Sequence, residues 1–190
     1  AIFSVLLPAL PGHAQDAKPV YVGFDGAYGV KNSTSAQAIE LGLTAAIHEI
    51  NAGGGVLDGR PIELLVQDNR SVTARGIGNL EEFAATKDVV GVFGGGCSPV
   101  LVHQLKRVHE LNVPLLDVWG AADGITDHNF IPNDSFRLSL KDSCAMPTML
   151  GQAHGNGGDQ IGLLLPHTGW GRSHHNALGK PTEATPARKV

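Results

Sequence analysis

Residues 88–100 read DVVGVFGGGCSPV, an apolar run that ends in three glycines and continues into Cys97, Ser98 and Pro99. Such a run before a glycine-rich turn is typical of a buried strand, and a serine N-cap with proline at N1 predicts a helix directly after it. The turn has neither the Rossmann GxGxxG pattern nor the phosphate-loop GxxxxGK[ST] pattern. Because a helix N-terminus offers N–H groups and the positive end of a dipole, we expect this turn to cup a carboxylate.

The same strand-to-helix alternation repeats on both sides of the turn. Strand patterns occur at residues 20–24, 61–68, 88–94 and 113–119, and helix patterns at residues 35–51, 72–86 and 99–111. The first helix is indicated by Ile39, Leu43, Ile47 and Ile50 at helical spacing, and the NAGGG after it predicts a left-handed helix end. Strands that alternate with helices of this length predict βαβ units, and therefore an α/β fold with a mostly parallel sheet.

The rhythm changes after Trp119. An irregular stretch leads to a predicted strand at 135–140, a helix at 142–154, a strand at 160–166 and a loop at 167–173. We therefore expect a first lobe over residues 15–138 and the start of a second lobe over residues 139–178. One helix and one strand cannot bury a core, so this second unit is expected to be unfinished. The tail over residues 179–190 has two prolines and no apolar period, which predicts disorder.

Composition and the N-terminus favour an exported globular protein. Hydrophobic residues make up 42% of the chain, and a net charge of −4 gives no basic footprint for nucleic acid. Residues 1–14, AIFSVLLPALPGHA, look like the end of a secretory signal peptide, with Gly12 and Ala14 as the small residues before a cut at Gln15. The alternative is a buried N-terminal element, which the two prolines in this stretch disfavour. We therefore expect a periplasmic or extracellular location.

No pattern in the chain points to catalysis or to a metal. Cys97 and Cys144 could pair in an oxidising compartment or remain as free, buried thiols. His167, His174 and His175 raise the idea of a metal site, but no Cys or carboxylate stands at ligand spacing. GxSxG, HExxH and suitably spaced carboxylate pairs are absent from the sequence. We expect no cofactor, no metal and no enzymatic activity.

Three loops should meet at the carboxyl edge of the predicted sheet, where open α/β sheets bind ligands. Besides the glycine-rich turn with Ser98, these are WGAADG at 119–124 and AYGVKNSTS at 27–35. The small residues of the WGAADG loop leave backbone N–H groups accessible, and Trp119 offers a flat wall. Tyr28 is the aromatic of the other loop. Either aromatic could instead be a packing residue, but their joint position favours a ligand site.

With these motifs in place, the chain resembles the type I periplasmic binding proteins of ABC importers, specifically the branched-chain amino acid (Leu/Ile/Val) binding family. The resemblance runs from about residue 20 to about residue 178 and rests on GAYG (26–29), HEINAGGGVLDGRPIEL (48–64), VVGVFGGGCSP (89–99), VPLLDVWGAADGITD (113–127), FRLSL (136–140) and IGLLLPHTGWGRS (161–173). It implies the periplasmic binding protein type I fold, in which a parallel sheet carries helices on both faces and two such lobes close on a small ligand. Family members are about twice as long, so the resemblance implies a first lobe plus the start of a second, as in a truncated chain.

The resemblance also implies site residues. Ser98 in the third-strand loop would bind the carboxylate of the ligand. Ala121, Ala122 and Asp123 would help to hold its carboxylate and amino groups, and Trp170 would flank it, the alternative for Trp170 being a packing role in its loop. Family members that bind amino acids often carry a hydroxyl residue in the GAADG region, so the ligand here could differ from a plain amino acid.

We interpret the chain as the solute-binding subunit of an ABC importer that captures an amino acid, amide or carboxylate with Ser98 and the loop at 121–123. Aromatic walls would come from Tyr28, Trp119 and Trp170. Its partners would be the small ligand and a membrane permease. A ligand-sensing domain of a signalling system has the same fold and is one alternative. A doubly wound enzyme and a non-functional fragment are two others.

Overall fold

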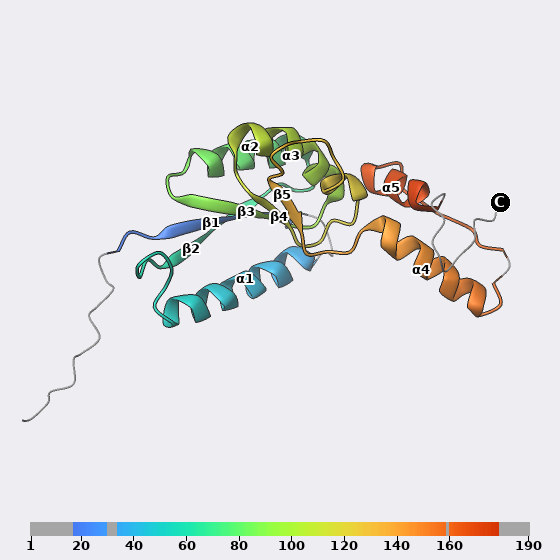
Figure 1. Ribbon diagram of the computed structural model, residues 1–190, viewed down its shortest axis with the longest axis horizontal. Coiled ribbons are helices and arrows are strands. Elements are labelled where there is room, and N and C mark those ends of the chain that lie inside the picture. The colour runs from blue at the N-terminus through green and yellow to red at the C-terminus, as the bar shows by residue number, and fades with distance from the viewer. Residues whose placement is uncertain (1–16, 30–33, 159, 179–190) are drawn as a thin grey trace, which may run out of the picture.

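The computed structural model describes residues 17–29, 34–158 and 160–178. Its centre is a five-stranded parallel sheet in the order β2-β1-β3-β4-β5. The strands are β1 (Val20–Gly26), β2 (Ile62–Asp68), β3 (Val89–Gly94), β4 (Leu115–Asp117) and β5 (Ser135–Arg137). The helices are α1 (Ser35–Ala52), α2 (Thr73–Ala85), α3 (Ser98–Leu111), α4 (Asp142–Gly155) and α5 (Gly169–Leu178), with a 3-10 turn η1 (Asp123–Ile125). Helix α1 covers one face of the sheet and α2 and α3 cover the other (Figure 1). The predicted α/β class, with a parallel sheet and helices on both faces, is confirmed.

The core lies between the sheet and the two helices α2 and α3. Its buried side chains are Leu80, Phe83, Val92, Leu101, Val108, Val113, Leu115, Ala122 and Ile125. Each fully buried leucine or phenylalanine contributes about 1.5–3 kcal/mol relative to an exposed one. Gly23 of β1 permits this packing, because a Cβ atom there would lie 3.0 Å from the ring of Phe83. The core therefore holds β3, β4 and α3 in fixed relation, and these elements carry the candidate site.

A buried polar cluster ties β1 to α2 and α3. Asp25 Oδ1 accepts a hydrogen bond from Asn79 Nδ2 at 2.7 Å, and its Oδ2 accepts one from Gln104 Nε2 at 2.8 Å. Burial raises the pKa of Asp25, and the hydrogen bonds oppose that rise. Since its partners belong to the two helices, Asp25 holds them against the sheet.

Helix α1 lies on the other face, and its end differs in detail from the prediction. The apolar stripe is only partly covered, and Ile50 is 40% exposed. The helix ends at Ala52, and the left-handed backbone falls at Gly54, with φ +107°. Asn51, predicted to end the helix, instead exchanges two hydrogen bonds of 2.8 Å with the backbone of Ile62. This residue therefore anchors the start of β2.

Two predictions beyond the sheet are wrong. Residues 160–166, predicted as a strand, are coil, because among the described residues no strand lies beside them to complete a ladder. Leu164 is 99% exposed there. Residues 167–173, predicted as a loop, contain the start of α5. Helices α4 and α5 pack on each other beyond the end of the sheet (Figure 1).

Two predictions concern the ends of the chain. The predicted signal peptide at residues 1–14 lies outside the described residues, and so does the tail at residues 179–190 that was predicted to be disordered. The division into two lobes, 15–138 and 139–178, stays a prediction. Over the part of the chain that the structure describes, no helix is both long enough and apolar enough to cross a bilayer.

Candidate ligand-binding site

A cavity of about 460 Å³ opens at the carboxyl ends of β3 and β4. It is lined by Gly96, Cys97, Ser98, Pro99, Trp119, Gly120, Ala121, Pro166, Thr168 and Trp170. Four of the predicted site residues, Ser98, Trp119, Ala121 and Trp170, thus come together from three separate segments of the chain. We call this space the Ser98 cavity. Contact of these residues with a ligand stays a prediction.

Close packing or backbone conformation requires glycine at the end of β3 and at the two positions after it. A Cβ atom at Gly94 would overlap the side chain of Leu101, and one at Gly95 would lie 2.6 Å from Cε2 of Phe24. Gly96 has φ +97°, a conformation that side chains disfavour. The turn is therefore tight, and it delivers the N-terminus of α3 to the cavity.

Ser98 does not cap α3, contrary to the prediction. The N-cap residue is Cys97, so Ser98 is the first helical residue and Pro99 the second. The Ser98 hydroxyl instead accepts hydrogen bonds from the backbone N–H of Ala121 at 3.1 Å and of Ala122 at 3.3 Å. These bonds join the turn after β3 to the loop after β4. Sequence reasoning missed them because they bridge positions 23 and 24 residues apart.

Asp117, at the end of β4, holds the loop that follows this strand. This residue was not identified from the sequence. Asp117 is fully buried, and its Oδ1 accepts the backbone N–H of Trp119 at 3.0 Å and of Gly120 at 2.6 Å. Burial raises the pKa of Asp117, and these backbone hydrogen bonds oppose the rise. A carboxylate that ends an apolar strand, as in VPLLDVW, was the signal that could have found it.

Arg137 holds the same loop from β5. Its Nη2 donates to the carbonyl oxygen of Ala122 at 2.6 Å, and its Nη1 donates to that of Gly120 at 3.2 Å. Since these carbonyls and the N–H groups of the loop are all hydrogen bonded, residues 119–122 form a fixed wall.

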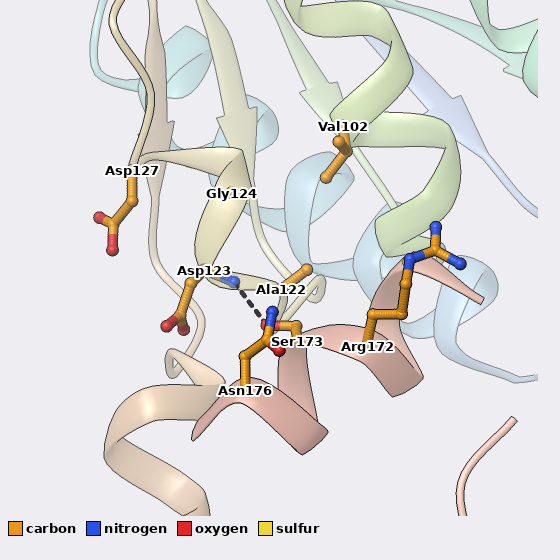
Figure 2. A pocket seen from close by; sticks show the side chains of 9 residues that line it. Val102, Ala122, Asp123, Gly124, Asp127, Arg172, Ser173 and Asn176 are labelled. Atoms are coloured by element: carbon orange, nitrogen blue, oxygen red, sulfur yellow. Dashed lines mark hydrogen bonds between the residues drawn. The ribbon is translucent and has the colours of Figure 1, made fainter. Parts of the chain in front are cut away.

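Ala122 and Asp123 line a neighbouring cavity of about 410 Å³ (Figure 2). Its lining is Val102, Ala122, Asp123, Gly124, Asp127, Gly169, Arg172, Ser173 and Asn176. The backbone N–H of Asp123 donates to Ser173 Oγ at 3.0 Å, and its Oδ1 accepts the N–H of Ser143 at 3.0 Å. Asp123 therefore joins η1 to both α5 and α4, and the structure does not bring it to the Ser98 cavity.

Tyr28 is also not among the residues that line the Ser98 cavity. Its hydroxyl donates to Glu40 Oε2 at 2.7 Å, and its ring meets the edge of Phe24 at a centroid distance of 6.0 Å. Burial and the hydrogen bond to Glu40 raise the pKa of Tyr28. The side chain thus packs toward α1, which is the packing role left open for it.

Trp170 lies on α5 rather than in a loop. The N–H of Gly171 donates to Thr168 Oγ1 at 3.2 Å, which is the hydrogen bond of a threonine N-cap. Thr168 also lines the Ser98 cavity. A threonine three residues before Gly171 was the signal that could have predicted this helix start.

Both cysteines are free, and neither is buried, whereas free cysteines were expected to be buried. Cys97 is half-buried at the Ser98 cavity, and Cys144 is exposed on α4. Within the described residues, no group of three or more His, Cys, Asp or Glu side chains is placed to hold a metal ion.

A parallel α/β lobe with a cavity at the carboxyl edge of its sheet is a ligand-binding arrangement of doubly wound folds. The chain belongs to the periplasmic binding protein family, whose sequence model matches residues 19–185.

Solved structures with the same fold include several substrate-binding proteins. The ABC transporter substrate-binding protein from Desulfitobacterium hafniense is 21% identical with a TM-score of 0.70, over 84% of this chain and 46% of its own. The branched-chain amino acid transporter substrate-binding protein LivJ from Streptococcus pneumoniae, in complex with isoleucine, is 27% identical with a TM-score of 0.59, over 66% and 35%. A solute-binding protein of an ABC transporter from R. palustris, in complex with 4-hydroxybenzoate, is 18% identical with a TM-score of 0.73, over 84% and 42%.

The chain thus spans less than half the length of these solved structures. A comparison with curated protein sequences gave no significant match.

Proposed function

We propose that the chain is the solute-binding part of an ABC importer, acting in the periplasm without catalytic activity. It captures a small ligand in the Ser98 cavity, between two lobes, and delivers it to a membrane permease. The family and the named functions of the solved relatives support this proposal. The observation that carries it is the cavity at the carboxyl edge of the sheet, where Ser98 meets two tryptophans.

Ser98 is suited to donate a hydrogen bond to a carboxylate. A hydroxyl has one donor and two acceptor sites, and the N–H groups of Ala121 and Ala122 use the acceptor sites. The hydroxyl hydrogen therefore remains as a hydrogen-bond donor for a ligand, and it lies at the positive end of the α3 dipole. The polar head of the ligand is therefore an acceptor, as a carboxylate or an amide carbonyl is.

The body of the ligand is apolar. Trp119 and Trp170 are 56% and 39% exposed in this structure, and both line the cavity beside Pro99. Exposed aromatic surface of this kind is covered favourably by an apolar or aromatic group. Isoleucine and 4-hydroxybenzoate, bound in two solved relatives, both combine a carboxylate with an apolar body. We propose a ligand of this class.

A thermal melt with a ligand panel tests the function. Isoleucine, isoleucinamide and 4-hydroxybenzoate are added in turn at a hundredfold excess over the dissociation constant, determined for each by calorimetry. Binding at that excess stabilises the folded chain by ~2.7 kcal/mol, which raises Tm by about 5–10 °C. A chain that melts cooperatively and binds none of the panel would contradict the proposal.

A further inference from the structure

We propose that Thr168, directly before α5, is a second ligand-binding residue of the Ser98 cavity, and that it makes the cavity selective for a carboxylate over the matching carboxamide. The hydroxyls of Ser98 and Thr168 each donate a hydrogen bond to one oxygen of the ligand's carboxylate. This inference rests on the proposed function and specifies the head group of the same ligand.

The Thr168 hydroxyl is held at the cavity with its hydrogen unused. The residue is half-buried, and it lines the cavity beside Trp170. Its Oγ1 accepts the backbone N–H of Gly171 at 3.2 Å, which caps α5 and holds the oxygen in place. A hydroxyl also has one hydrogen to donate, and no described residue accepts that of Thr168. The cap therefore leaves the donor of Thr168 available to a ligand.

Ser98 offers the same kind of donor from α3. Its side chain is only 5% exposed, and its oxygen accepts the N–H groups of Ala121 and Ala122. Because these two bonds use both acceptor sites, Ser98 can form a further hydrogen bond only as a donor. Among the described residues, none accepts its hydrogen. A buried donor without a partner is costly, and a ligand oxygen would satisfy it.

The starts of the two helices lie against each other. Pro99 is the second residue of α3 and Gly169 is the first residue of α5. A Cβ atom on Gly169 would lie 3.9 Å from the Cα atom of Pro99. Ser98 and Thr168 directly precede these two residues in the chain, and both line the same cavity. One small head group can therefore take a hydrogen bond from each helix start.

The electrostatic setting of the cavity favours an anion. Helix α3 has 14 residues and α5 has 10, and both turn the positive, N-terminal end of their dipole toward the cavity. No Asp, Glu, Lys, Arg or His is among the described residues that line it. A carboxylate there is not repelled by an acidic side chain, and it offers an oxygen to each hydroxyl. A carboxamide is neutral and has one oxygen, so it gains less from the dipoles and from the second donor.

The first experiment uses the unmodified chain and two pairs of probes. Calorimetry compares 4-hydroxybenzoate with 4-hydroxybenzamide, and isoleucine with isoleucinamide, so that each pair differs only in the head group. We expect each acid to bind about 10- to 100-fold more tightly than its amide, the size of effect of a hydrogen bond to a charged group. Equal affinities within both pairs overturn the inference and leave the proposed function standing. A chain that melts cooperatively and binds none of the four probes overturns both.

The second experiment separates ligand binding by Thr168 from its capping of α5. Aspartate caps a helix as well as threonine does, but its carboxylate is an acceptor only and carries a negative charge. Thr168→Asp should therefore keep α5 and weaken the binding of 4-hydroxybenzoate about 100-fold. It should bind 4-hydroxybenzamide as well as the unmodified chain does, because the new carboxylate accepts the amide N–H. Thr168→Ser keeps both the cap and the donor, and it should leave both affinities unchanged.

The ratio of acid to amide affinity is the decisive readout, since a purely structural role of Thr168 would change both affinities alike. A Thr168→Asp variant that melts cooperatively and keeps the ratio of the unmodified chain overturns the inference. If this variant does not melt cooperatively, Thr168→Gly replaces it, because glycine at an N-cap costs little stability and has no hydroxyl. The ratio should then fall about tenfold, the effect of one lost donor, and an unchanged ratio overturns the inference.

Discussion

At the scale of the residue, Ser98 links the two loops that form the cavity. Ser98→Ala removes the acceptor for two backbone N–H groups, one of which belongs to the buried Ala122. We expect it to lower the free energy of unfolding by about 1–3 kcal/mol and to weaken ligand binding roughly tenfold. Urea unfolding and calorimetry check the two effects separately. Ser98→Cys, of similar shape but with a weak donor, should lie between, and full affinity in Ser98→Ala would remove Ser98 from the site.

Asp68, at the end of β2, should stabilise the fold only while its carboxylate is ionised, so its contribution to stability depends on pH. Burial would raise its pKa, but three backbone N–H groups, including those of Tyr28 and Arg70, outweigh burial and lower it. Its stabilising effect is therefore fully present above its ordinary pKa of 3.8 and is lost as the pH falls through the lower folded-state value. Asp68→Asn should cost about 1.5–3 kcal/mol near neutral pH.

The loss in free energy of unfolding caused by Asp68→Asn should shrink as the pH falls through the folded-state pKa of Asp68. The wild-type carboxyl is then protonated and, like the amide of asparagine, uncharged. Urea unfolding at a series of pH values measures this loss. Glu63→Gln, at an exposed position on the same strand, is the control, and its cost should stay small throughout. A cost for Asp68→Asn that does not depend on pH would contradict the assigned role.

At the scale of the element, the placement of α5 depends on Gly171. A Cβ atom there would overlap the backbone carbonyl of Pro166, so Gly171→Ala must shift α5 or the segment before it. We expect a loss of about 1–3 kcal/mol in stability and a changed Trp170 emission in a Trp119→Phe background. Gly169→Ala is the matched control, since its Cβ would lie 3.9 Å from the nearest atoms. Equal behaviour of the two variants would show that α5 is not held by this contact.

The elements of the sheet and its covering helices could be predicted from the sequence, and the segment beyond them could not. Apolar runs predicted the strands, and helical spacing predicted the helices, because each of these elements buries one face against the others. The apolar run at 160–166 has the composition of a strand, but composition does not supply a neighbouring strand. The start of α5 was missed because Gly169 and Gly171 suggested a loop, whereas Thr168 caps a helix there.

At the scale of the whole molecule, topology predicted where the Ser98 cavity lies but not how its walls are held together. Loops after parallel strands meet at one edge, which was enough to bring Ser98 and Trp119 to one cavity. Trp170 was implied by the family resemblance, and it reaches the cavity from α5. The supporting contacts of Asp117 and Arg137 depend on pairings across the fold that no local pattern encodes. For the same reason Tyr28, expected as a wall, proved to pack toward α1.

The architecture also predicts how stability is distributed. Strands β1 and β3 are paired on both sides, whereas α4 and α5 lie beyond the sheet and are joined to the segments around it by contacts such as Asp123–Ser173. Elements with few buried contacts open with less than the global free energy. In hydrogen exchange we therefore expect peptides from 169–178 to exchange faster than peptides from 89–94 in the free chain. A bound ligand should slow the exchange of 169–178, by up to ~100-fold at a hundredfold excess over Kd, because opening α5 breaks the cavity. Equal protection of the two peptides in the free chain would mean that α5 and the sheet unfold as one unit.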